Sequence, residues 1–177
     1  MKTFYLPLLM ALCGPLATVA QPADTAWRPY KHPKGLFSLR YPPGWATRTD
    51  DNGRVFFTSP LQTDTDNFRE NVNISAAASP GLTQQDLLNG VADIIADIKA
   101  NMNDFELLEQ KTWPQSGLKG LQITYKAKIP SLGEFDLQFV QRFFVKGPTL
   151  YTITFTSLSS DASLQASGMR LLNSIRF

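Results

Sequence analysis

The chain has 177 residues, 43% of them hydrophobic, a formal net charge of +2 and one cysteine. That length suits a single domain with a proper hydrophobic core. The near balance of charge disfavours nucleic acid and anionic membrane surfaces as partners, and one cysteine excludes a disulfide within the chain.

Residues 1–20 are predicted to be a signal peptide. Lys2 gives a basic start, and Phe4–Leu12 is an apolar run that is too short to span a membrane as a helix. Thr18 and Ala20 place small residues three and one positions before a cut between Ala20 and Gln21. The alternative is an N-terminal anchor that is not cleaved.

Cys13 raises the question of a lipid anchor. A lipidated cysteine follows a small residue, whereas Leu12 precedes Cys13, which also lies inside the apolar run. We therefore expect Cys13 to leave with the signal peptide, so that the mature chain has no cysteine.

The next residues divide into a lead-in, 21–35, and a single domain, 36–177. The lead-in is rich in proline and polar residues, and we expect it to be extended. Phe37–Tyr41 alternates apolar and polar residues like a half-buried strand, and Pro42-Pro43-Gly44 turns the chain into a second strand at Trp45. Asn52-Gly53 then predicts a hairpin whose return strand is Val55–Thr58.

A polar loop over 59–71, a strand over 72–76 and a helix follow. Thr83 is the expected N-cap of that helix, with Asp86 completing a capping box. Apolar residues at helical spacing continue to Met102, and we expect this stripe to outweigh the helix-weakening Gly90.

Four strands and a second helix complete the chain. The first strand is expected to stop before Trp113-Pro114, and the remaining three, over 121–129, 135–145 and 151–156, form a meander with short turns. The helix begins near Asp161 with Ser160 as its cap. Because the strands alternate and are one-sided, we predict the α+β class: an antiparallel sheet with helices packed on one face.

The order of these elements resembles the PsbP-like family. The residues that carry the resemblance are the segment FSLRYPPGW (37–45), Val55-Phe56-Phe57, the segment 147–152 and the closing Ser174-Ile175-Arg176-Phe177. The resemblance implies a PsbP-like α/β sandwich and suggests the bacterial envelope branch of the family, similar to DcrB. It also implies a periplasmic protein, with full secretion as the alternative, and a role in binding another protein rather than in catalysis.

The residues themselves indicate no catalytic or metal chemistry. His32, the one histidine, lies in the lead-in, so no triad is expected, and there is no Gly-rich phosphate loop. The acidic loop 59–71 lacks EF-hand spacing, and we expect it to be solvated rather than to hold a cation. We therefore expect no cofactor. A catalytic carboxylate pair of the glycosidase type stays open as an alternative, because sequence order does not show which carboxylates are neighbours in space.

Three aromatic residues are candidates for an interaction surface: Phe56, Phe144 and Trp113. In the pairs Phe56-Phe57 and Phe143-Phe144, one ring must point away from the helix-covered face of a regular strand. That ring either forms an exposed patch or packs under a loop or bulge.

Two functions follow from these observations. The first is a non-enzymatic exported envelope protein that binds a protein partner through the open face of its sheet or its loops. The second is a carrier of a small apolar ligand or lipid held between sheet and helices. A hydrolase ranks third, because the members of a triad are missing.

Overall fold

The structure is a computed structural model that describes residues 26–64, 66–133 and 135–177. The predicted cleavage site between Ala20 and Gln21 lies outside the described residues, as does Cys13. No helix in the described ranges is long and apolar enough to cross a membrane.

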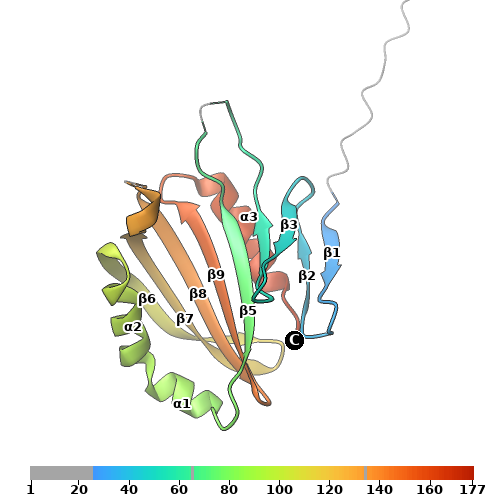
Figure 1. The fold of residues 1–177 in the computed structure, drawn as a ribbon, viewed down its shortest axis with the longest axis vertical. Helices are drawn as coiled ribbons and strands as arrows, with labels where there is room; N and C mark the ends of the chain where they lie inside the picture. The colour runs from blue at the N-terminus through green and yellow to red at the C-terminus, as the bar shows by residue number, and fades with distance from the viewer. Residues whose placement is uncertain (1–25, 65, 134) are drawn as a thin grey trace, which may run out of the picture.

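In the described residues, seven antiparallel strands form one sheet in the order β3-β4-β5-β9-β8-β7-β6, and a two-strand ribbon, β1-β2, lies beside it (Figure 1). The strands are β1 (Arg28–Lys31), β2 (Ser38–Tyr41), β3 (Ala46–Thr49), β4 (Val55–Thr58), β5 (Asn71–Ala78), β6 (Asn103–Gln115), β7 (Leu118–Lys128), β8 (Leu137–Lys146) and β9 (Thr149–Leu158). The meander β6–β9 is as predicted, and β9 pairs with β5 to join the two halves of the sheet.

Within the part of the chain that the structure describes, three α-helices pack against the sheet: α1 (Gln84–Asn89), α2 (Val91–Ala100) and α3 (Ala162–Ser174), with a 3-10 turn η1 at Pro130–Leu132. The Thr83 capping box is confirmed, since Thr83 Oγ1 accepts from Asp86 N and Asp86 Oδ2 accepts from Thr83 N. The single helix expected through Gly90 is instead two, because Gly90 ends α1 with φ −83° and ψ 12° and α2 starts afresh.

The cap of α3 differs from the prediction by one residue. Asp161 Oδ1 accepts a hydrogen bond from Leu164 N at 3.0 Å, which is the bond an N-cap side chain makes to the third helical residue. The cap is therefore Asp161 and not Ser160.

Helices cover both faces of the sheet. Phe143 and Phe144 are adjacent on β8 and both buried, so they point to opposite faces. Phe144 lies in the core with α3 and the β1–β2 ribbon, and Phe143 lies in the core with α1 and α2. The α+β class and the antiparallel sheet are confirmed. The prediction that helices cover one face of the sheet is wrong: in Figure 1, α3 lies behind the sheet and α1–α2 in front of it. Both faces are covered because β8 carries large apolar residues on each of them.

Two segments are more regular than the sequence predicted. β6 runs through Trp113-Pro114 to Gln115, which an edge strand allows because an edge N–H needs no partner in the sheet. Residues 28–31 of the expected lead-in form β1, which pairs with β2, and Tyr30 contacts both Phe37 and Phe57. The folded domain therefore includes residues N-terminal to position 36.

Candidate functional site

Positive charge gathers on one side of the molecule. Residues 26–49 and 162–177 contain seven Lys or Arg and no Asp or Glu. The fold brings these segments together, because Ser38 and Arg176 exchange two backbone hydrogen bonds of 2.8 Å and Arg40 N donates to Ser174 Oγ at 2.9 Å.

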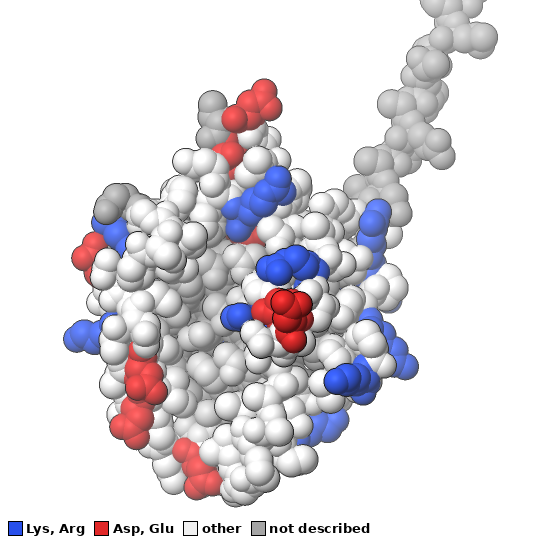
Figure 2. All heavy atoms as spheres, in the orientation of Figure 1, with Lys and Arg blue, Asp and Glu red and all other residues white. Residues whose placement is uncertain are grey.

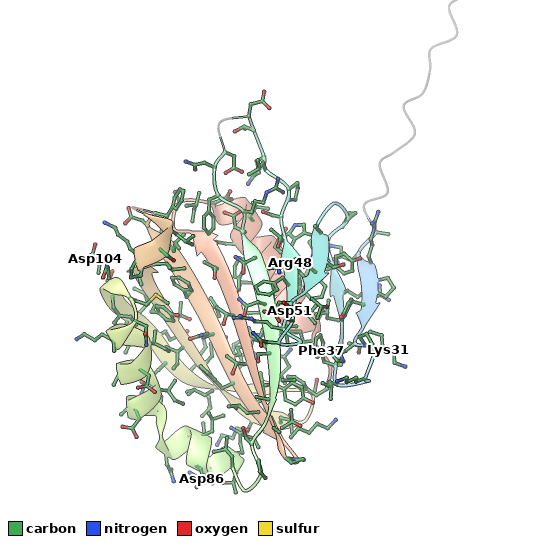
Figure 3. The ribbon with its side chains drawn as sticks, in the orientation of Figure 1. Lys31, Phe37, Arg48, Asp51, Asp86 and Asp104 are labelled. Carbon is green, nitrogen blue, oxygen red and sulfur yellow. The ribbon has the colours of Figure 1, made fainter. Side chains whose placement is uncertain are left out.

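The opposite side of the molecule carries both signs of charge, with acidic residues on its helices. Asp86, Asp93 and Asp97 lie on α1–α2, and Figure 2 shows acidic side chains along that edge with some Lys or Arg among them, while the edge formed by the ribbon carries only Lys and Arg. Figure 3 places Lys31 at one side and Asp86 and Asp104 at the other. A net charge of +2 thus conceals a strongly uneven distribution.

Lys31, Arg40 and Arg176 line one hollow of about 580 Å³ on the outer face of the ribbon. The pairs Lys31↔Ser38, Pro29↔Arg40 and Ser38↔Arg176 place these side chains on the same face, because directly opposite residues of antiparallel strands share a face. An adjoining hollow of about 280 Å³ contains Arg40 again, together with Arg170 and Trp27. We call Lys31, Arg40, Arg170 and Arg176 the basic surface.

The basic surface is partly pre-organised. Arg170 lies over the Trp27 ring at 4.3 Å, a cation–π contact that holds its guanidinium near the hollow. Arg176 Nη1 donates to Asn173 O and Ile175 O at 3.0 and 2.8 Å, which satisfies carbonyls at the end of α3. No carboxylate lines either hollow, and among the described residues Lys31 and Arg40 form no ion pair.

Beside this surface lies a completely buried arginine, Arg142 of β8. Its Nε donates to Gln122 Oε1 at 2.8 Å, Nη1 to Gln115 Oε1 at 3.1 Å and Nη2 to Asn173 Oδ1 at 2.9 Å; these four residues form the arginine cluster. The guanidinium also lies 4.0 Å from the centre of the Trp113 ring. Burial lowers the pKa of Arg142 to about 10, so it remains protonated at neutral pH.

The three aromatic candidates have different surroundings. Phe144 is fully buried, so the expectation of an exposed ring there is wrong. Both faces of the sheet are covered at that point, and Phe177 lies over Phe144 at 5.0 Å. Phe56 is half-buried on the face opposite Phe57, with the guanidinium carbons of Arg48 and Arg54 at 4.6 and 5.2 Å from its centre.

Trp113, the third candidate, is half-buried on edge strand β6, where it contacts Arg142 and Lys111. The sheet around Phe56 is polar rather than apolar, since its same-face neighbour on β5 is Asn73. An apolar patch on the open face is therefore not formed by these three rings.

In the acidic loop 59–71, the carboxylates of Asp66 and Glu70 accept hydrogen bonds from nearby residues of the protein. Asp66 accepts hydrogen bonds from the backbone N–H groups of Gln62 and Phe68, which lowers its pKa. Glu70 is buried and accepts from Ser59 Oγ, and desolvation by burial, with Asp161 nearby, raises its pKa. In the described part of the chain no group of three or more metal-ligating side chains is assembled.

His32 lies outside any such group. Its Nδ1 accepts from Lys34 N at 3.2 Å and its ring contacts Phe37, while partial burial and the Lys34 charge lower its pKa. This arrangement fixes the turn between β1 and β2 and places no nucleophile beside the imidazole.

Comparison with known proteins identifies the architecture. No family model and no curated protein matches the chain. Among solved structures, the cyanobacterial PsbP of Synechocystis sp. PCC 6803 has a TM-score of 0.61 and 15% identity, covering 92% of this chain and 99% of that chain. This chain has the PsbP/Mog1-like fold.

Two further structures share the PsbP/Mog1-like fold. LpqN, involved in cell envelope biogenesis of Mycobacterium tuberculosis, has a TM-score of 0.60 and 8% identity over 85% of this chain and 90% of that chain. The Saccharomyces cerevisiae Ran-binding protein Mog1p has a TM-score of 0.55 and 10% identity over 86% and 96%. At such identities the likeness shows the fold alone.

Sequence reasoning missed the basic surface and the arginine cluster. A run from residue 26 to 49 without any acidic residue was visible, but overall charge balance concealed it. Its partner segment lies at the other end of the sequence, and contacts such as the pairing of Ser38 with Arg176 unite the charges in the fold.

Proposed function

We propose that the protein is a non-enzymatic, exported accessory module of the envelope that binds an acidic surface of another protein through its basic surface. The observation that carries this proposal is the hollow of about 580 Å³ lined by Lys31, Arg40 and Arg176, with no carboxylate among the described residues that line it. Cations held together without counter-charges repel one another, and an acidic partner relieves that repulsion.

The shape of the surface supports a macromolecular partner. The hollow lies on the outer face of the β1–β2 ribbon and is continuous with a second one through Arg40 and Ser174. A broad, shallow surface fits a protein better than it fits a small molecule, which is usually enclosed. Opposed charges also accelerate encounter, so binding should weaken as salt is raised.

Export to the periplasm is supported by the signal-like residues 1–20 and by the fold shared with LpqN, which is involved in cell envelope biogenesis. Likeness to the DcrB branch belongs to this proposal too, because it rests on the sequence segments 37–45, 55–57, 147–152 and 174–177. Full secretion is the alternative destination.

The carrier hypothesis receives less support. The hollows at the basic surface lie on the outside of the ribbon, and the largest is lined by three cations. The space between the sheet and α1–α2 is instead filled by a core that includes Leu87, Tyr125 and Phe139. A carrier predicts a lipid that co-purifies with the protein, which native mass spectrometry would detect.

The test compares two charge-reversal pairs. Lys31→Glu/Arg40→Glu changes the basic surface, and Lys99→Glu/Lys146→Glu makes the same change of charge at exposed positions on α2 and at the end of β8. Each protein is photocrosslinked in the cells that produce it, and the partner found is then titrated with purified protein at two salt concentrations.

The expected result is a discrete partner whose affinity falls about tenfold or more in the first pair and stays within about twofold in the second. Equal affinities for wild type and the first pair would contradict the proposal. Binding of the purified protein to phosphatidylglycerol vesicles, lost in the first pair and without any protein partner, would assign the surface to a membrane instead.

A further inference from the structure

The arginine cluster contains a charge that has no counter-charge. Arg142 is fully buried, yet its three hydrogen-bond acceptors are neutral amide oxygens. Among the described residues no carboxylate lies within 4.0 Å of its guanidinium. Buried charges are ordinarily paired with an opposite charge, because amides compensate only part of the cost of desolvation.

The acceptors are held in place by the rest of the fold. Gln115 Nε2 donates to Leu172 O and Ile175 O at 2.6 and 3.1 Å, which turns Gln115 Oε1 toward Arg142. Gln122 lies directly opposite Arg142 on β7 and is itself buried. On these two sides the guanidinium is therefore fixed.

The third hydrogen bond of the Arg142 guanidinium, to Asn173, lies at the protein surface. Asn173 is exposed at the end of α3, and its Oδ1 is the acceptor for Arg142 Nη2. Next to it is a hollow of about 380 Å³ lined by Trp113, Pro114, Gln115, Ser116, Asn173 and Arg176. Arg142 contacts three of these lining residues, and Arg176 adds a second guanidinium at the mouth.

We infer that this hollow binds an oxyanion, the carboxylate or phosphate group of a small ligand, between Arg142 and Arg176. Rotation of the Asn173 side chain away from Nη2 presents guanidinium N–H groups to the anion, and such groups match the oxygen geometry of both classes of anion. Trp113 forms the wall, because its ring already stacks on Arg142. This inference does not depend on the partner-binding role of Lys31 and Arg40.

One substitution tests the idea without dismantling the cluster. Asn173→Asp is isosteric and places a carboxylate on Nη2, so it supplies internally the charge that the ligand would bring. Asn67→Asp makes the same chemical change in an exposed loop and serves as the control. Lys31→Gln/Arg40→Gln separates this site from the basic surface.

The probes are inorganic phosphate and acetate, titrated at constant ionic strength against sodium chloride. The readout is the NMR signals of the Arg142 Nε–H and Trp113 indole N–H groups. We expect saturable shifts in wild type, in Asn67→Asp and in Lys31→Gln/Arg40→Gln, and at least tenfold weaker binding in Asn173→Asp. The stronger of the two probes identifies the group as phosphate or carboxylate.

Two outcomes would overturn the inference. One is a shift that chloride reproduces at the same ionic strength, which would make Arg142 a purely structural residue. The other is unchanged phosphate and acetate binding in Asn173→Asp, which would place the anion elsewhere. A loss of binding in Lys31→Gln/Arg40→Gln alone would likewise assign the anion to the basic surface.

Discussion

Gly168 of α3 allows the helix to approach β9 unusually closely. A methyl group at this position would overlap three carbon atoms of the Phe155 ring, Cζ, Cε1 and Cε2, and that ring is only 1% exposed. Phe155 pairs with Val72 and Val140 in the middle of the sheet, so it has little freedom to move. We therefore predict that Gly168→Ala destabilises the protein.

The magnitude is a difference of two effects. In an exposed helix interior, Gly→Ala stabilises by about 1 kcal/mol. Overpacking of a core costs about 1–3 kcal/mol, and overlap with three atoms of a confined ring favours the upper end of that range. The net effect of Gly168→Ala is then a loss of about 2 kcal/mol, or a fall in Tm of roughly 4–8 °C for a chain of this size.

Urea unfolding followed by far-UV circular dichroism measures this loss. Ala166→Gly, at an exposed position of the same helix, is the control for helix propensity and should cost about 1 kcal/mol. In the double variant Gly168→Ala/Phe155→Leu the smaller side chain should restore part of the loss, with a coupling of about 1 kcal/mol or more. If Gly168→Ala is instead stabilised by about 1 kcal/mol, the close approach of α3 to Phe155 is wrong.

Three further predictions concern single side chains. Burial raises the pKa of Glu70, so the folded state binds a proton more tightly than the unfolded chain does. The free energy of unfolding should therefore fall as pH rises from the ordinary glutamate pKa of 4.5 through the raised pKa. Glu70→Gln should flatten this pH dependence and be more stable than wild type at pH 7, as thermal melts across pH would show. Asp161→Ala removes the cap of α3 and should cost about 1 kcal/mol in urea unfolding; because Asp161 also accepts a hydrogen bond from Gln62 Nε2, Gln62→Ala is the control, and an equal loss in that control would contradict the capping role. Phe144→Ala should cost about 3–5 kcal/mol because the ring is fully buried, and Phe56→Ala at a half-buried site less than half as much; equal losses would contradict the different burial of the two rings.

Local patterns were enough to predict most strands and the main helix cap. Alternation identified the meander β6–β9, and Thr83-Asp86 fixed the start of α1. The errors arose where tertiary context decided the outcome. Pro114 is compatible with β6 only because that strand lies at the edge of the sheet, a position that no local pattern reveals.

The candidate sites were less accessible to sequence reasoning. Arg142 lies between Gln141 and Phe143 on β8, and its partners Gln115, Gln122 and Asn173 come from three other elements. Nothing in the order of these residues shows that they meet. The same holds for the two helix-covered faces, because an adjacent pair such as Phe143-Phe144 predicts opposite directions without showing what covers each ring.

The pairing of β5 with β9 also limits how early the sheet can form during synthesis of the chain. Ala78 pairs with Thr149 and Asn71 with Thr156, so β5 emerges from the ribosome long before its partner strand β9 has been synthesised. At about 5–20 residues per second the wait is several seconds, during which residues 28–78 cannot complete their core. A newly made chain therefore cannot complete this core until β9 and α3 have been synthesised, and residues 28–78 stay exposed to proteases during that interval.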